Sequence, residues 1–208
     1  MYLSKLTLDA GHPQSRRDLG NAYEMHRTLA RAFAPAADVP PARFLWRLES
    51  EAPYRLSSIV LVQSTLPADW GVIESLTGYA LEILGNKAVD LARLIHAGGR
   101  YRFRLLANPT VTRAGKRYGL LREEEQLAWL VRQGERYGFK VLGCVRGASE
   151  RLHLHKARTA NRITLDTALF EGVLEAVAPD LLCQAILQGL GHAKAFGLGM
   201  LSLARLPG

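Results

Sequence analysis

The chain has 208 residues, of which 48% are hydrophobic, and its 27 Lys and Arg against 19 Asp and Glu give a formal net charge of +8. This content is enough to bury a sizeable core, and the basic balance favours a polyanionic partner, nucleic acid before membrane. No apolar run approaches the ~18 residues of a membrane span and the first residues lack the apolar core of a secretory signal, so we expect a cytoplasmic protein that does not bind membranes.

The first half of the chain is expected to alternate strands and helices in the order strand, helix, strand, strand, helix, strand. Period-2 alternation and short apolar runs predict four strands, at residues 2–8, 44–48, 56–63 and 79–83. A helical period predicts one long helix over 19–33, and a turn with Pro67 and Asp69 opens a short helix through Leu76. This order is that of the ferredoxin-like fold.

The second half repeats the order of elements without repeating the letters. We expect strands at 101–105 and 139–145, a long hairpin over 151–177, a final strand from 198, and helices at 123–137 and 179–188. The sequence therefore predicts an α+β protein with two tandem ferredoxin-like domains, at residues 1–90 and 100–208. The sheet aromatics Tyr101 and Phe103 alternate with arginines, and we expect them to face the core rather than to stack on RNA bases.

A glycine-rich segment over residues 189–199 precedes the final strand. Glycine permits a positive φ and a close approach of phosphate to backbone N–H groups, and His192 and Lys194 add positive charge. The segment is thus predicted to cradle an anion, and Gly191, His192, Lys194, Gly197 and Gly199 are candidate RNA-binding residues. It follows a helix and enters a strand, the reverse of a nucleotide-binding loop. The alternative is that the glycines only cap a helix and start a strand.

The helix predicted over 19–33 carries the candidate chemistry. Its apolar residues form one stripe, while Tyr23, His26, Arg27 and Arg31 lie on a neighbouring face. An imidazole can transfer protons at neutral pH, a phenol can donate or position, and guanidinium groups can stabilise phosphate oxygens. This set suits metal-free transesterification of RNA. The alternative is an ordinary surface histidine beside a solvated basic face.

Two further basic stretches are candidates for RNA binding. One lies around the turn of the expected hairpin, at 157–161, and consists of Arg151, Lys156, Arg158 and Arg162. The other precedes the helix at 123 and consists of Arg113, Lys116 and Arg117. Proteins read an A-form stem by its shape and phosphates, which cationic side chains can contact. The alternative for the first stretch is a solvated hairpin tip.

No metal or other cofactor is expected. His153 and His155 alternate on one strand, but no cysteine or carboxylate lies beside them at ligand spacing. The two cysteines, Cys144 and Cys183, have no CxxC partner, which argues against a zinc site or a structural disulfide.

Several motifs, in order along the chain, resemble the CasE family of CRISPR-associated endoribonucleases of the repeat-associated superfamily. They are Asn21-x-Tyr23-x-x-His26-Arg27, Phe103-Arg104-Leu105-x-Ala107-Asn108-Pro109, Gly115-Lys116-Arg117, Ala128-Trp129-Leu130, Phe170-Glu171-Gly172 and the glycine-rich segment. The resemblance implies metal-independent cleavage of precursor CRISPR RNA within repeat hairpins, 5′-hydroxyl and 2′,3′-cyclic phosphate ends, and retention of the product as a subunit of Cascade.

The same resemblance implies residue roles. His26 corresponds to the general acid or base and Tyr23 to its partner, with Arg27 and Arg31 supporting the scissile phosphate. Two other interpretations stay open from the residues themselves, a catalytically silent RNA-binding subunit and a nucleotide-binding enzyme, although the order of elements around the glycines disfavours the second. The sequence leaves the oligomeric state of the free protein open.

Overall fold

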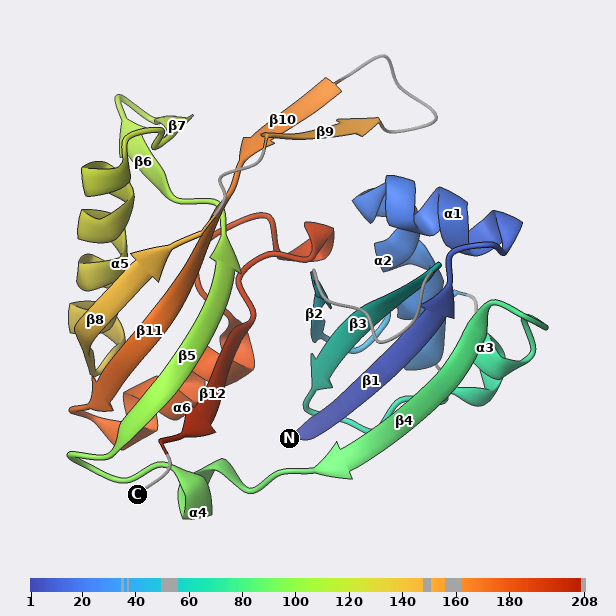
Figure 1. Cartoon of the computed structure of the whole chain (residues 1–208), viewed down its shortest axis with the longest axis horizontal. Coiled ribbons are helices and arrows are strands. Elements are labelled where there is room, and N and C mark those ends of the chain that lie inside the picture. The colour runs from blue at the N-terminus through green and yellow to red at the C-terminus, as the bar shows by residue number, and fades with distance from the viewer. Residues whose placement is uncertain (35, 37, 50–55, 148–150, 156–161, 207–208) are drawn as a thin grey trace. The chain divides into compact units, whose positions relative to one another are not determined.

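The computed structural model describes all residues except 35, 37, 50–55, 148–150, 156–161 and 207–208. The chain forms two compact units, each with a four-stranded antiparallel sheet and helices (Figure 1). Their bodies are Met1–Val89 and most of the chain from Asp90 onward. Ala195–Gly197 and part of the ribbon formed by β9 and β10 group with the first unit, although the sequence had placed both within the second domain.

The first sheet has the strand order β2-β3-β1-β4. Its strands are β1 (Tyr2–Asp9), β2 (Phe44–Glu49), β3 (Ser57–Ser64) and β4 (Ala80–Ala88). β1 runs antiparallel to both β3 and β4, and β2 to β3. This is the order of the ferredoxin-like fold, so the predicted fold class is confirmed for this unit.

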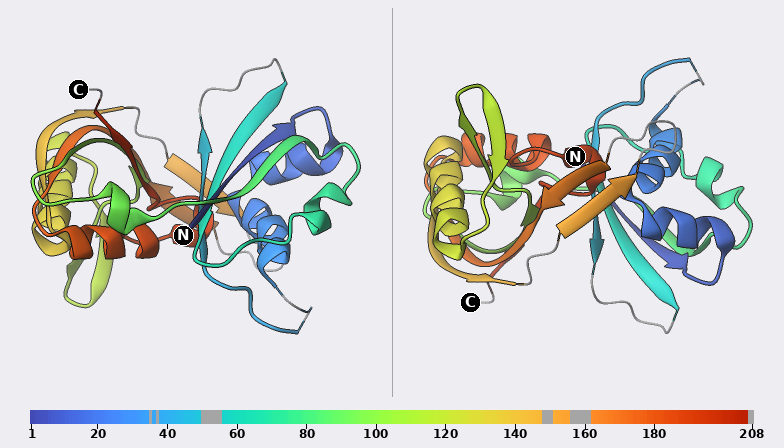
Figure 2. Two further views of the ribbon diagram at one scale, coloured as in Figure 1. Left: turned by 90° about the horizontal axis from the view of Figure 1, so that it is seen from below. Right: turned by 90° about the horizontal axis from the view of Figure 1, so that it is seen from above.

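Helices lie on one side of the first sheet, as Figure 2 shows. They are α1 (Pro13–Gly20), α2 (Ala22–Ala30), the 3₁₀ turn η1 (Arg31–Phe33) and α3 (Gly71–Glu74). The prediction of one continuous helix over 19–33 is wrong, because Asn21 is extended (φ −146°, ψ 105°) and separates α1 from α2. The predicted apolar stripe is confirmed, since Met25, Leu29 and Phe33 pack in the core against β1 to β3.

The second unit repeats this arrangement with the strand order β12-β5-β11-β8. Its strands are β5 (Arg100–Ala107), β8 (Phe139–Arg146), β11 (Ala168–Ala176) and β12 (Leu201–Arg205), and its long helices are α5 (Glu123–Tyr137) and α6 (Pro179–Gln188). Both helices have the predicted bounds. Tyr101 and Phe103 are buried, as expected, so neither offers a stacking platform for bases.

Smaller elements complete the second half and correct two predictions. They are α4 (Leu91–Leu94), β6 (Thr110–Arg113), β7 (Lys116–Gly119), β9 (Arg151–His155), β10 (Arg162–Asp166) and the 3₁₀ turn η2 (Lys194–Phe196). The hairpin expected over 151–177 is in fact a separate β9–β10 ribbon followed by β11, a central strand of the second sheet. The final strand begins at Leu201 rather than at 198. None of the helices formed by the described residues has both the length and the apolar character that crossing a membrane requires.

Candidate active site

The start of α2 is fixed by Asn21, which ends one helix and begins the next. Its side-chain Oδ1 accepts a hydrogen bond from the backbone N–H of Tyr23 at 3.1 Å, and its own N–H donates to the Asp18 carbonyl. Such N-cap bonds satisfy donors that the helix itself leaves free. The cap therefore sets where the first turn of α2, with Tyr23, begins.

His26 lies in the middle of α2 and is half-buried. Its imidazole stacks on the ring of Phe44 in β2, with centroids 4.8 Å apart and planes inclined by 16°. Nδ1 is buried and has no hydrogen-bond partner within the described part of the chain. Nε2 is therefore the nitrogen left to meet a ligand.

Burial lowers the pKa of His26 below its ordinary value, because the protein surroundings solvate the imidazolium less well than water does. The neutral ring thus prevails at neutral pH. A neutral imidazole with one accessible nitrogen can accept a proton there, which suits a general base.

The lowered pKa of His26 also predicts a pH dependence of stability. The unfolded chain takes up the proton first as pH falls below about 6.5, so the contribution of His26 to stability is present above that pH and is lost as pH falls through the folded-state pKa. We expect wild type to lose stability relative to His26→Gln over this interval, measured by urea unfolding at a series of pH values. Parallel curves for the two proteins would contradict the shift.

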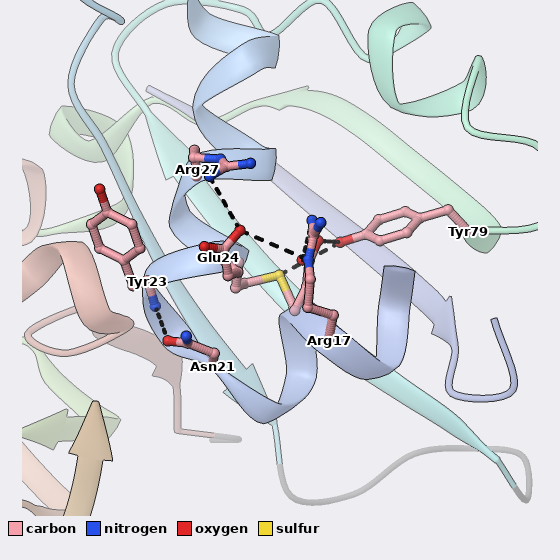
Figure 3. A network of polar contacts seen from close by, with 8 residues as sticks. Arg17, Asn21, Tyr23, Glu24, Arg27 and Tyr79 are labelled. Atoms are coloured by element: carbon pink, nitrogen blue, oxygen red, sulfur yellow. Dashed lines mark hydrogen bonds and ion pairs between the residues drawn. The ribbon is translucent and has the colours of Figure 1, made fainter. Parts of the chain in front are cut away.

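The other three residues of the predicted catalytic face differ in their surroundings. Tyr23 is half-buried, and its ring points away from the polar contacts around it (Figure 3). The Arg27 guanidinium is mostly exposed but lies 3.5 Å from the carboxylate of Glu24, one turn earlier. Arg31 is exposed at the end of α2 and makes no ion pair within the described residues. The structure therefore places Tyr23, His26 and Arg27 on α2 and Arg31 at its C-terminal cap, with Arg27 already paired.

A polar network that the sequence did not predict joins α1, α2 and the residue before β4 (Figure 3). The buried Asp18 carboxylate accepts hydrogen bonds from Arg17 at 2.8 Å and from the Tyr79 hydroxyl at 3.0 Å. Arg17 also lies 3.7 Å from Glu24, across the break at Asn21. Burial and the adjacent Asp18 carboxylate raise the pKa of Tyr79, so its phenol stays protonated and donates.

The predicted basic stretch before α5 forms an exposed hairpin of β6 and β7. Ala114 and Gly115 both have positive φ, as a two-residue type I′ turn requires, and Arg113 is paired with Lys116 across the strands. Arg113, Lys116 and Arg117 are exposed and make no ion pair within the described residues. Their charges are therefore available to a phosphate backbone.

The charges of the hairpin extend toward the glycine-rich segment. Partial burial lowers the pKa of His192, and the positive charges of Arg117 and Lys194 lower it further. Since these cations lie close enough to act on the same imidazole, the structure gathers them into one basic cluster. Lys194 itself lies in η2 and is half-buried.

The basic stretch around β9 and β10 is described only in part. Arg151 is exposed, but its guanidinium pairs with Asp166 at 2.9 Å. Arg162 opens β10, whereas Lys156 and Arg158 lie outside the described residues. Of this set, therefore, the one described guanidinium already has a carboxylate partner.

The glycines of residues 189–199 serve close packing. Gly191, Gly197 and Gly199 all have positive φ, and a Cβ would lie 3.1 Å from Trp129 at Gly191 and 2.9 Å from Trp46 at Gly197. At Gly199 it would meet the Leu190 carbonyl oxygen. These contacts favour the alternative interpretation for the glycines themselves, namely that they shape the path between α6 and β12. His192 and Lys194 carry the charge of the segment.

The described residues contain no group of three or more His, Cys, Asp or Glu that could hold a metal ion. His153 and His155 both lie in β9, and Cys144 and Cys183 are free thiols. The pKa of both thiols is raised, and burial is the largest cause in each case. Neither thiol is therefore an activated nucleophile.

The chain is similar over its whole length to known proteins. A family model described as CRISPR associated protein matches residues 1–205. CRISPR-associated endoribonuclease Cse3 of Thermus thermophilus is 37% identical over 98% of this chain and 100% of that protein. CRISPR system Cascade subunit CasE of Escherichia coli K12 is 29% identical over 99% of this chain and 100% of that protein. The solved structure of Thermus thermophilus Cse3 with an RNA representing a pre-cleavage complex matches with a TM-score of 0.86 and 35% identity over 98% of both chains.

Proposed function

The chain belongs to the family of CRISPR-associated proteins, and from this premise we propose that it is a metal-independent endoribonuclease that cleaves precursor CRISPR RNA within repeat hairpins. After cleavage it stays bound to the mature RNA as a Cascade subunit. The observation that carries the proposal is the half-buried imidazole of His26, with one accessible nitrogen, on a helix face that also presents Tyr23, Arg27 and Arg31. We also propose that this activity is cytoplasmic.

The proposed reaction is an internal transesterification. The ribose 2′-oxygen attacks the adjacent phosphorus, the bond from phosphorus to the 5′-oxygen breaks, and His26 Nε2 accepts the proton of the 2′-hydroxyl. The leaving 5′-oxygen takes a proton, for which the Tyr23 phenol is the candidate donor. The products are a 5′-hydroxyl and a 2′,3′-cyclic phosphate. Arg31 and the outer N–H groups of Arg27 stabilise the charge that builds on the phosphate oxygens.

RNA binding is assigned to the cationic surfaces of the second half. The hairpin residues Arg113, Lys116 and Arg117, with His192 and Lys194, offer charges suited to stem phosphates. From the sequence we add Arg151, Arg162, Lys156 and Arg158 to the proposed RNA-binding residues. The names of two relatives support this assignment, since one is a Cascade subunit and the other was solved with a pre-cleavage RNA.

Incubation with a panel of repeat hairpin RNAs tests the reaction class. In buffer containing EDTA we expect one defined cut, a 5′-hydroxyl on the downstream fragment and a cyclic phosphate on the upstream one, because the nucleophile is part of the substrate. A matched RNA with a single 2′-deoxyribose at the cut site should bind equally but remain intact. Products are identified by mass spectrometry and by labelling with polynucleotide kinase.

The possible outcomes separate the candidate functions. Cleavage of the deoxy substrate, or rescue of an EDTA-inhibited reaction by Mg²⁺, would overturn the proposed chemistry. Tight binding without any cut would instead identify a catalytically silent RNA-binding subunit.

A further inference from the structure

The orientation of the His26 imidazole has no evident hydrogen-bonded cause. Catalytic histidines are commonly oriented by a hydrogen bond from the second ring nitrogen to a carboxylate or carbonyl oxygen. Here Nδ1 is buried but has no such partner among the described residues. Something other than a hydrogen bond must therefore hold the plane of the ring.

Aromatic rings from two other elements supply that support. The imidazole stacks on the ring of Phe44, with centroids 4.8 Å apart. The ring of Phe44 also stacks on that of Phe33 in η1, with centroids 4.5 Å apart and planes inclined by 11°. We call these three rings the aromatic column. Phe44 and Phe33 are both buried. His26 is thus the half-buried end of three nearly parallel rings, with its outer side free of this stack.

The inner end of the column is anchored to the sheet. Phe33 meets the ring of Trp70 edge-on at 5.9 Å, and the Trp70 indole N–H donates to Ser4 Oγ in β1 at 3.0 Å. A Cβ on Gly85 in β4 would lie 2.5 Å from the Trp70 ring, so the indole is confined on that side as well. Column and sheet therefore form one packed structure that holds Phe44 in place.

We propose that Phe44 is the positioning residue of the active site, holding the His26 imidazole by face-to-face stacking so that Nδ1 stays against the protein and Nε2 faces the substrate. The inference rests on the proposed function, in which His26 is catalytic. A stack resists tilting of the ring away from the plane of Phe44, and burial of Nδ1 selects which edge faces outward. Phe44 acts through His26 and needs no contact with RNA.

A comparison of three variants tests the proposal. Phe44→Leu keeps an apolar side chain of similar bulk but removes the ring plane, and Phe44→Tyr keeps the plane. Phe139→Leu is the matched control, because it makes the same change at a buried position of the second unit, outside the aromatic column. In single-turnover cleavage at saturating protein, we expect Phe44→Leu to slow the reaction about tenfold or more while the RNA Kd stays within about threefold. Phe44→Tyr and Phe139→Leu should keep rates within about threefold of wild type.

The second readout is the ¹H–¹³C spectrum of the histidine side chains. Ring current from Phe44 should shift the His26 ring protons upfield, a shift that is lost in Phe44→Leu and kept in Phe44→Tyr and Phe139→Leu; the signal is assigned by its absence from His26→Gln. A wild-type rate in Phe44→Leu, an unchanged His26 signal, or an equal rate loss in Phe139→Leu would overturn the proposal. Failure of the proposed function looks different, since either wild type would then cut no RNA or His26→Ala would cleave at the wild-type rate, whatever the spectra show.

Discussion

Replacing His26 by alanine is expected to slow cleavage of a cognate repeat hairpin by about a hundredfold to ten-thousandfold, while RNA affinity stays within about tenfold. The reason is that the variant loses the Nε2 that we propose as acceptor of the 2′-hydroxyl proton, whereas the hairpin and ribbon cations that we propose bind the stem are unchanged. Single-turnover cleavage at saturating protein gives the rate, and filter binding with a 2′-deoxy substrate gives Kd.

His96→Ala is the matched control for this experiment. His96 is exposed in the second unit and its ring contacts the carbonyl of its neighbour Ala97, so its loss should leave rate and affinity at wild-type values. If His26→Ala cleaved as fast as His96→Ala, the imidazole would have no part in the chemistry, and the basic helix face would be a binding surface only.

The elements that follow from local sequence patterns were predictable. α5 and α6 have the predicted bounds because their amphipathic periods are regular and each has a clear start or stop, three glutamates in the first turn of α5 and a proline at the start of α6. The break at Asn21 was missed although a signal was present. Asn21 and Glu24 have the spacing of a capping box, which indicates a helix start inside the run that was assigned to a single helix.

The placement of the candidate catalytic residues on one helix face was predictable, but the contacts that support them were not. Helical spacing alone puts Tyr23, His26 and Arg27 on one face. The contacts of Phe44 with His26, and of Tyr79 with Asp18, join residues 18 and 61 positions apart, and no local period carries that information. Only the pairing of strands in the folded sheet brings these partners to the helices.

For the glycine-rich segment, composition alone left two interpretations open. Its composition suggested an anion cradle, because glycine density is common to phosphate loops and to tight packing. The packing of Gly197 against Trp46 and of Gly191 against Trp129 could not be foreseen, since those indoles come from distant parts of the chain. The charged residues between the glycines, by contrast, are where the sequence placed them.

Asp18→Ala is expected to lower the free energy of unfolding of the first unit by about 2–3 kcal/mol. The Asp18 side chain is fully buried, and its removal leaves the Tyr79 hydroxyl, also buried, without its carboxylate acceptor and Arg17 without its closest partner. A buried polar group that loses its partner costs more than the hydrogen bond was worth.

Urea unfolding measures the effect. Unfolding is followed by the fluorescence of Trp46 and Trp70 in a Trp129→Phe background, so that only the first unit reports.

Tyr79→Phe is the matched control, because it removes the donor and leaves Asp18 with Arg17. We expect it to lower the free energy of unfolding by about 1–2 kcal/mol. The double variant should cost less than the sum of the two single changes, since both remove the same hydrogen bond. Additive losses would show that Asp18 stabilises the unit by some other contact.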